Sequence, residues 1–284
     1  MVESGASAAE AIRAAAVRLQ ATSDTARLDA EVLMAHALGS TRSELLLRHM
    51  RAPAPAGYAA LVERRARHEP VAYITGTQEF FGLPFTVTPD VLIPRGDSEA
   101  LVEAALALRP DARRVLDCGT GSGALLLAVL ANLPEARGIG IDRSEAALAV
   151  ASANARALGL DARTEMTVAD WRRPGWRDPL GAPFDLVLAN PPYVEDDAPL
   201  APSVRGFEPA GALFAGPLGL DDYAVLIPQL PVLLAPGGSA LVEIGHSQAE
   251  AVGGIGERAG LGWSLHRDLA ERPRVIVFST MQGR

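Results

Sequence analysis

The stretch that decides the fold is VLDCGTGSG, at residues 115–123. Its first half is mostly apolar, and three glycines then alternate with small polar residues before a second apolar run begins at residue 124. Glycines in this order let the backbone turn sharply and approach a ligand where any side chain would collide. The stretch therefore predicts a strand, a glycine-rich loop and a helix, which together open a parallel α/β sheet.

Segments of strand type and helix type continue to alternate after Asp111. We expect strands at residues 114–117, 138–142, 165–169, 184–189, 239–245 and 274–280, and helices at about 124–133, 145–159, 220–234 and 247–259. Pro228 and Pro231 should kink the third of these helices. Such alternation predicts parallel βαβ units with helices on both faces of the sheet, so the expected fold class is α/β.

The residues before this sheet have the pattern of short helices. Ser7 and Thr41 each precede a glutamate by three positions, as in the capping box that starts many helices. We expect helices at about residues 8–20, 25–38 and 56–69, followed by two short strands that join at Gly82. The sequence thus predicts a helical domain at residues 1–70, a β-hairpin linker at 71–95 and an α/β domain at 96–284.

The composition is that of a well-packed globule, with 49% hydrophobic and 21% charged residues among 284. Cys118 is the only cysteine, which excludes an intrachain disulfide, and no residues have metal-ligand spacing. Residues 1–4 lack the basic start of a signal peptide, and no apolar run reaches the roughly 18 residues that a membrane span needs. We therefore expect a cytoplasmic protein without a bound metal.

The charge is distributed unevenly along the chain. All 26 basic residues are arginine; residues 1–88 hold nine of them and nine acids, whereas residues 89–284 hold 17 arginines and 25 acids. The whole net charge of −8 therefore lies in the second part. A protein that grips duplex DNA usually carries a basic face, so this balance argues against nucleic acid as a partner.

A glycine-rich loop alone leaves two interpretations open, a tight turn and a nucleotide-binding loop. The glycines at 119, 121 and 123 have the spacing i, i+2, i+4, which differs from the i, i+2, i+5 of dinucleotide-binding proteins. Asp117 also precedes the loop, where it would repel a pyrophosphate. Both features argue against a dinucleotide oxidoreductase.

Acidic residues end three successive predicted strands. Asp117 suits a cationic ligand group, Asp142 can accept hydrogen bonds from both ribose hydroxyls, and Asp170 with Trp171 offers an acceptor for an exocyclic amine beside a plate for a purine ring. Each acid alone has a simpler interpretation, since Asp142 precedes Ser144 and could merely start a helix. Together the three favour S-adenosylmethionine (SAM) as the cofactor.

The fourth predicted strand ends in Asn190-Pro191-Pro192-Tyr193. Proline lacks an N–H and pushes the preceding residue to extended geometry, so Asn190 is presented at a stiff strand end. Its side-chain oxygen and the Pro191 carbonyl could each accept one N–H of a substrate amide and orient the nitrogen for methyl transfer. The Tyr193 ring could favour a cationic methyl group. The simpler interpretation is an ordinary turn at the end of a strand.

With these motifs the chain resembles the bacterial N5-glutamine methyltransferases that modify peptide chain release factors, the PrmC/HemK group. The shared motifs extend over nearly the whole length: Tyr73-Ile74-Thr75-Gly76, Glu79-Phe80-Phe81-Gly82-Leu83, Leu92-Ile93-Pro94-Arg95, Asp117 to Gly123, Asp170-Trp171, Asn190 to Tyr193, Phe207-Glu208-Pro209, Arg267-Asp268-Leu269 and Arg274-Val275. Several amino-methyltransferases share Asn-Pro-Pro-Tyr, but its combination with the helical N-terminal region and Leu-Ile-Pro-Arg is more specific.

The resemblance implies a seven-stranded Rossmann-like class I methyltransferase sheet with a small N-terminal helical bundle and a β-hairpin linker. It implies methylation of the glutamine in the Gly-Gly-Gln motif of class 1 release factors, with SAM as the methyl donor, by a monomer whose helical domain grips the release factor. The implied cofactor contacts are Gly119, Thr120, Gly121, Ser122, Gly123, Asp142, Trp171 and Asn190. The implied substrate contacts are Asn190, Pro191, Pro192 and Tyr193.

Gly96 departs from the family pattern, which has proline after Leu-Ile-Pro-Arg. We still expect Asp97 and Ser98 to cap a helix at residues 99–108. Two other functions stay open: an adenine-N6 methyltransferase of DNA or RNA, which would need a basic groove, and a SAM-binding adaptor without activity. The intact Asn-Pro-Pro-Tyr motif argues against the adaptor.

Overall fold

The computed structural model describes residues 5–181, 183–268 and 270–280, so Leu269 of the Arg267-Asp268-Leu269 motif lies outside the described residues. The chain divides into two compact units. Of the described residues, one unit contains 5–77 and 200–208, and the other contains those between 78 and 199 and between 209 and 280. Within the described residues, no helix is both long and apolar enough to cross a lipid bilayer.

The first unit is a bundle of short helices. It contains α1 (Ala8–Leu19), α2 (Ala26–Ala37), α3 (Arg42–Glu44) with a π-helical turn (Leu45–His49), α4 (Tyr58–Ala66), α5 (Val71–Thr75) and α9 (Pro202–Phe207). The predicted capping boxes of Ser7 and Thr41 are both present. The bundle packs around Ile12, Leu33 and Tyr58, which are almost fully buried.

Residues 71–75 form helix α5, whereas the sequence suggested extended structure there. Gly76 ends this helix with a φ of +76°, a conformation that glycine adopts without strain. The two predicted short strands follow as β1 (Thr77–Phe80) and β2 (Leu83–Thr86), paired in a small sheet. The chain reverses direction between them at Gly82, as expected.

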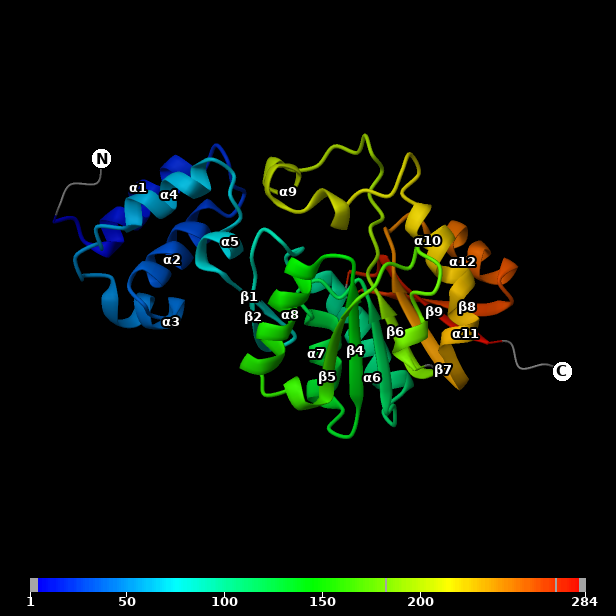
Figure 1. Ribbon diagram of the computed structural model, residues 1–284. Coiled ribbons are helices and arrows are strands. Elements are labelled where there is room, and N and C mark those ends of the chain that lie inside the picture. The colour runs from blue at the N-terminus through cyan, green and yellow to red at the C-terminus, as the bar shows by residue number, and fades with distance from the viewer. Residues whose placement is uncertain (1–4, 182, 269, 281–284) are drawn as a thin grey trace. The chain divides into compact units, whose positions relative to one another are not determined.

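The second unit contains one seven-stranded sheet. Its strands are β3 (Arg114–Cys118), β4 (Arg137–Asp142), β5 (Thr164–Val168), β6 (Phe184–Ala189), β7 (Leu234–Glu243), β8 (Leu261–Arg267) and β9 (Pro273–Thr280). Its main helices are α6 (Glu99–Leu108), α7 (Ala124–Asn132), α8 (Glu145–Ala157), α10 (Asp221–Leu226), α11 (Leu230–Leu233) and α12 (Ala249–Arg258). The strand order is β5-β4-β3-β6-β7-β9-β8, with β9 antiparallel to both of its neighbours (Figure 1). This confirms the predicted α/β fold class.

The sheet has the seven strands that the resemblance implies, but two of the elements predicted from the residue pattern are wrong. Strand β8 was not expected, because it is an edge strand whose residues are mostly half-buried and its apolar pattern is weak. The helix expected at 220–234 is broken into α10, a 3-10 turn (Ile227–Gln229) and α11, with Pro228 and Pro231 near the start of the last two pieces. Proline lacks the N–H that would continue a helix, so the pair breaks the helix and does not merely kink it.

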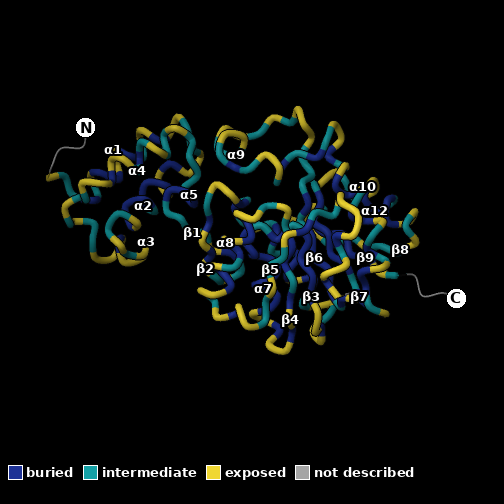
Figure 2. Tube along the Cα trace, viewed as in Figure 1, coloured by how far each residue is buried: buried dark blue, intermediate teal, exposed yellow. Residues whose placement is uncertain are grey.

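Buried residues concentrate along the central strands of the sheet, as the dark tube in Figure 2 shows. One apolar cluster contains residues of α6 and α7, and a second contains residues of α10, α11 and α12. Side chains of a strand point alternately to the two faces, so neighbouring residues such as Val115 and Leu116 belong to different clusters. The central strands are thus covered on both faces.

Strands β3 and β6 lie side by side where the order of the sheet changes direction. From β3 the chain builds outward through β4 to β5, whereas β6 starts the other half of the sheet. Cys118 at the end of β3 pairs in register with Ala189 at the end of β6. Ligands of open α/β sheets bind at such a switch point, beyond the carboxyl ends of the strands.

Candidate active site

A cavity lies at the carboxyl ends of the parallel strands, at the switch point between β3 and β6. Its lining includes nine of the predicted site residues: Gly119, Thr120, Gly121, Ser122, Asp142, Asp170, Trp171, Asn190 and Pro192. Four others are not among the lining residues: Asp117, Gly123, Pro191 and Tyr193. Tertiary structure therefore gathers the ends of four strands around one space.

The glycine-rich loop has a backbone that only glycine adopts easily. Gly119, Gly121 and Gly123 all have positive φ, at +76°, +54° and +84°. A Cβ at Gly119 would lie 3.2 Å from Cη2 of Trp171, and one at Gly123 would lie 3.0 Å from Cδ1 of Leu127. Glycine is needed here both for backbone conformation and for close packing.

Asp142 organises the opposite side of this loop. One carboxylate oxygen accepts the backbone N–H of Gly121 at 3.1 Å, and the other accepts that of Ser144 at 2.9 Å. The N-terminus of α8 is capped by the Ser144 hydroxyl, which accepts the N–H of Ala147. Asp142 therefore does more than start a helix, since it joins the loop to the end of β4 and also lines the cavity.

Asp117 lies beneath the loop and is 1% exposed. Its Oδ2 accepts the Thr120 hydroxyl at 2.7 Å, while its Oδ1 is buried and has no hydrogen-bond partner within the described structure. Burial raises the pKa of this carboxyl to about 7. The buried, unpaired oxygen is an acceptor that a cationic group could satisfy.

Trp171 is held from several sides. Its indole N–H donates to Oδ1 of Asp222 at 3.1 Å, and its carbonyl accepts from the Gln229 amide at 3.0 Å. The far edge of the ring packs against Gly119. The preceding Asp170 accepts the backbone N–H of Arg172, so its carboxylate turns back into its own loop. The ring therefore forms a fixed apolar wall of the cavity.

The Asn190 side chain lines the cavity and makes no hydrogen bond to another described residue. Pro191 is buried behind it. The Tyr193 hydroxyl donates to Oε1 of Glu243 at 3.3 Å, and burial raises the pKa of this hydroxyl above its usual range. Asn190 is thus the member of the motif whose polar side chain lines the cavity. Tyr193 instead hydrogen-bonds to Glu243, which lies outside the cavity lining.

The expectation that Asp97 and Ser98 cap α6 is wrong. The Ser98 side chain makes no capping hydrogen bond to this helix, and Asp97 forms ion pairs with Arg272 and Arg274. Arg272 lies in the loop before β9 and Arg274 lies on β9. Both are more than 170 positions from Asp97, so the sequence alone did not predict these ion pairs.

Several cavity residues had no predicted role in a binding site. Arg95 and Ser98 belong to the segment that continues Leu-Ile-Pro-Arg, so this motif was their signal. No sequence motif pointed to Asp222, because an acid in the first turn of a helix is common and its contact with Trp171 spans 51 positions.

Comparison with known proteins identifies both parts of the chain. The profile described as the PrmC N-terminal domain matches residues 10–76, and that described as a methyltransferase domain matches residues 110–238. In the structure of the hMettl16 catalytic domain in complex with MAT2A 3'UTR hairpin 6, 83% of the chain aligns with 78% of this one, with a TM-score of 0.55 and 15% identity. At this identity the likeness concerns the fold alone, and it agrees with the predicted methyltransferase sheet.

Relatives are similar over almost the full length. The release factor glutamine methyltransferase of Cereibacter sphaeroides is 44% identical over 277 residues, which cover 95% of this chain and 97% of the relative. That of Geobacter sulfurreducens is also 44% identical and covers 84% of this chain and 83% of its own length. The chain therefore belongs to the family of release factor glutamine methyltransferases.

Proposed function

We propose that this protein transfers a methyl group from SAM to the side-chain amide nitrogen of the glutamine in the Gly-Gly-Gln motif of class 1 peptide chain release factors. Membership of the family supports the reaction and the substrate class. The observation that carries the proposal is the register of β3 and β6, in which Cys118 pairs with Ala189. Because of this register, the glycine-rich loop and Asn190 follow the ends of two neighbouring strands at the same level of the sheet.

The residues around the cavity fit SAM. The loop from Gly119 to Ser122 offers a backbone that approaches a ligand closely, and Asp142 lies beside it as an acceptor for ribose hydroxyls. Trp171 supplies a flat wall for a purine ring, with Asp170 at the same strand end. Asp117 lies beneath the loop and outside the cavity lining, and we assign the cationic end of the ligand to its buried, unpaired Oδ1. When bound, SAM supplies a methyl group on a sulfonium, which is a good leaving group.

The protein must make a poor nucleophile react. The lone pair of an amide nitrogen is delocalised into its carbonyl, so the reaction requires exact placement of this nitrogen more than it requires a base. We assign one N–H of the glutamine amide to Oδ1 of Asn190 and the other to the carbonyl of Pro191. Formation of the nitrogen–methyl bond would be matched by cleavage of the sulfur–methyl bond, whose electron pair would stay on the neutral thioether sulfur. The amide nitrogen would then give up one N–H proton to water. Placement and complementary polarity then provide most of the rate.

The remaining assignments concern the partner. We propose that the helical domain, residues 1–70, holds the release factor away from its reactive loop, that residues 71–95 link the domains, and that residues 96–284 carry catalysis. Helix α5 belongs to the helical unit, so the linker proper consists of β1, β2 and the segment after them. We further propose that the protein acts as a monomer in the cytoplasm.

The test is direct. The purified protein is incubated with labelled SAM and a class 1 release factor, and the methyl group is mapped by peptide mass spectrometry. We expect the mass of one methyl group on the glutamine of Gly-Gly-Gln, and no label when that glutamine is replaced by asparagine. Label in DNA or RNA in a parallel reaction, with none in the release factor, would refute the proposal.

A further inference from the structure

Tyr193 is held at both of its polar ends by one segment of the chain. Its hydroxyl donates to Oε1 of Glu243, the last residue of β7, at 3.3 Å. Its backbone carbonyl accepts from the side-chain amide of Gln248 at 3.1 Å. Gln248 is itself fixed, because its Oε1 accepts the backbone N–H of Gly245 at 2.9 Å. The segment from 243 to 248 therefore acts as a rigid support behind the Asn-Pro-Pro-Tyr motif.

Glu243 is the unusual member of this support. It is 1% exposed, and its Oε2 is buried without a hydrogen-bond partner in the described structure. Burial raises the pKa of the carboxyl, and the Ser98 hydrogen bond and the nearby Arg274 oppose this effect. A buried acid costs free energy unless it is paired, so a purely structural position would favour an apolar residue. Within the described residues, its carboxylate accepts hydrogen bonds from the Ser98 side chain and from the Tyr193 hydroxyl, the latter at 3.3 Å.

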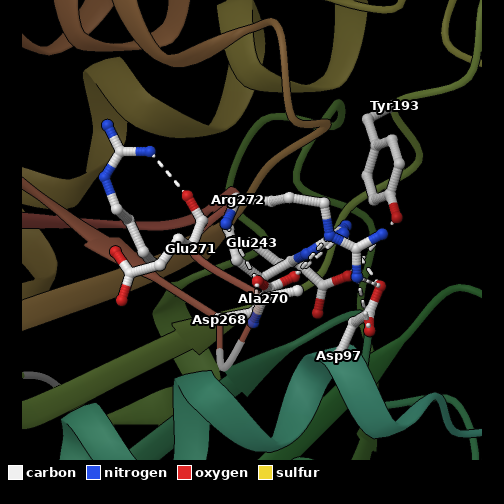
Figure 3. Close-up of polar contacts among 9 residues, drawn as sticks. Asp97, Tyr193, Glu243, Asp268, Ala270, Glu271 and Arg272 are labelled. Carbon is white, nitrogen blue, oxygen red and sulfur yellow. Dashed lines mark hydrogen bonds and ion pairs between the residues drawn. The ribbon is translucent and has the colours of Figure 1, made fainter.

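The same cluster reaches the opposite lip of the cavity. Arg274, 8% exposed, donates to Asp97 at 2.8 Å and lies 3.7 Å from Asp268. Arg272 bridges the same two acids, at 3.3 Å and 3.0 Å. Figure 3 shows the labelled side chains of Tyr193, Glu243 and Asp97 near those of Asp268 and Arg272, which share the loop between β8 and β9. Asp97 belongs to the turn Gly96–Ser98, whose Ser98 lines the cavity.

We propose that Glu243 is a positioning residue for methyl transfer: by binding the Tyr193 hydroxyl it fixes the backbone that carries Asn190 and the Pro191 carbonyl. The inference rests on the proposed function of Asn190. Glu243 does not line the cavity, so it acts through Tyr193 and not on the substrate. The Arg274–Asp97 ion pair ties the same cluster to the cavity lip at residues 95–98.

The geometry predicts a specific kinetic signature. A shift of the amide acceptors by a fraction of an ångström lowers the rate of methyl transfer but leaves the SAM contacts of the glycine-rich loop intact. We therefore expect Tyr193→Phe, which keeps the ring and removes the hydroxyl, to lower kcat/KM for a release factor about tenfold. Glu243→Leu should lower it by about the same factor. Glu243→Gln keeps an acceptor for the hydroxyl and should retain activity within about threefold.

The decisive measurement is a double-mutant cycle with Tyr193→Phe, Glu243→Leu and the double variant. Both substitutions break the Tyr193–Glu243 hydrogen bond, and Glu243→Leu also removes the acceptor of Ser98, so the double variant should be no slower than Glu243→Leu alone. SAM affinity, measured by calorimetry, should stay within about twofold in all variants. Leu261→Ala on strand β8 serves as a control, since it removes buried apolar volume at the far edge of the sheet and should not change kcat/KM below its unfolding temperature.

Two outcomes would overturn the inference. If the losses in kcat/KM multiply in the double variant, the two residues act independently. If Glu243→Gln is as impaired as Glu243→Leu while Tyr193→Phe is fully active, Glu243 acts through something other than this hydrogen bond. Failure of the proposed function is distinguishable from both, because it requires that the wild-type protein itself transfers no methyl group to the release factor.

Discussion

Asn190 is positioned by residues that carry no chemistry of their own. Ala189, just before it, is paired in register with Cys118 on one side and with Val242 on the other. Pro191, just after it, cannot continue the ladder and restricts Asn190 to extended conformations. The strand therefore ends at the same place in every molecule, and the amide of Asn190 lines the cavity.

Replacement of Asn190 by alanine tests its proposed role as an acceptor for the substrate amide. We expect a loss of about 10² to 10³ in kcat, because one of two groups that orient the amide nitrogen is removed. SAM affinity, measured by calorimetry, should fall much less than kcat, because the glycine-rich loop, Asp142 and Trp171 still line the cofactor cavity. The matched control is Asn132→Ala, which removes the same amide from the end of α7, outside the cavity lining. Full methyl transfer by Asn190→Ala with normal SAM binding would exclude the proposed mechanism.

Gly96, where the family has proline, tolerates a side chain in this structure. Nothing lies within 4 Å of a Cβ built there, and the residue opens the 3-10 turn after Arg95, whose backbone is extended. Proline is compatible with a preceding extended residue and with the first position of a helical turn. We expect Gly96→Pro to stabilise the α/β unit by about 0.4–1 kcal/mol, through reduced freedom of the unfolded chain.

Gly82 provides the matched control for Gly96. It also has open space around a built Cβ, but its φ is +74°. We expect Gly82→Ala to destabilise the protein by about 1 kcal/mol, since an L-residue is strained there. Urea unfolding followed by tryptophan fluorescence measures both variants, because Trp171, Trp176 and Trp263 all lie in the α/β unit. Equal effects of the two substitutions would contradict the conformational argument.

Among whole elements, helix α12 shows how glycine sets the distance between a helix and the sheet. A Cβ at Gly256 would lie 2.2 Å from Cε1 of Phe278, and one at Gly253 would lie 2.4 Å from Cε2 of Trp263. Gly254, between them, has only the end of the Arg258 side chain nearby, at 3.5 Å. The helix can therefore lie close to β8 and β9 because two of its glycines face them.

Gly254 and Gly256 predict opposite effects of a substitution by alanine. Gly254→Ala should stabilise the protein by about 0.5–1 kcal/mol, because alanine has the higher helix propensity and meets no backbone or ring. Gly256→Ala should destabilise it by about 1–3 kcal/mol, because Phe278 must move in a well-packed core. Urea unfolding curves of the two variants give the comparison. A stabilised Gly256→Ala would mean that α12 does not pack as described.

The contact between α10 and the loop after β5 predicts an effect on cofactor binding. Asp222, on α10, is 4% exposed and accepts the indole N–H of Trp171, and it also pairs with Arg172 at 3.0 Å. We expect Asp222→Ala to weaken SAM binding about tenfold. The indole N–H of Trp171 would lose its acceptor, and the ring that forms the cavity wall would no longer be fixed. Glu257→Ala removes the acceptor of another indole, that of Trp263, away from the cavity, and should leave the affinity unchanged. Calorimetric titration with SAM decides between the two results.

At the scale of the whole molecule, the buried carboxyl of Asp117 couples stability to pH. Its folded pKa of about 7 exceeds the ordinary value of 3.8. In this interval the folded protein binds a proton that the unfolded chain has released, so stability falls as pH rises from about 4 to about 7. Deprotonation above this range leaves a buried charge without full compensation.

Asp117→Asn should remove this pH dependence, because the amide is neutral at every pH and can still accept from Thr120. We expect the wild-type protein to lose about 2–3 kcal/mol of stability relative to Asp117→Asn between pH 5 and pH 7. Urea unfolding of both proteins at these two pH values, followed by tryptophan fluorescence, measures the difference. Parallel pH profiles of the two proteins would show that Asp117 does not titrate in this interval.

The sequence alone predicted the elements whose signals are local. VLDCGTGSG specified a strand, a tight loop and a helix, because positive φ favours glycine and buried strands are apolar. The capping boxes at Ser7 and Thr41 marked two helix starts, because their hydrogen bonds span three residues. The same local logic missed β8, whose partner is β9 and whose own pattern is weak. It also treated residues 220–234 as one helix, although two prolines interrupt it.

Only the tertiary structure decided which distant residues meet. The contacts of Trp171 with Asp222, of Tyr193 with Glu243 and of Asp97 with Arg274, like the pairing of Cys118 with Ala189, join residues that lie 50 to 177 positions apart. No periodicity encodes such pairs, because they depend on strand order and register, which the packing of the entire sheet selects. The sequence thus determined the chemistry available at each strand end, and the fold determined that Asn190, the glycine-rich loop and their buried support converge on one cavity.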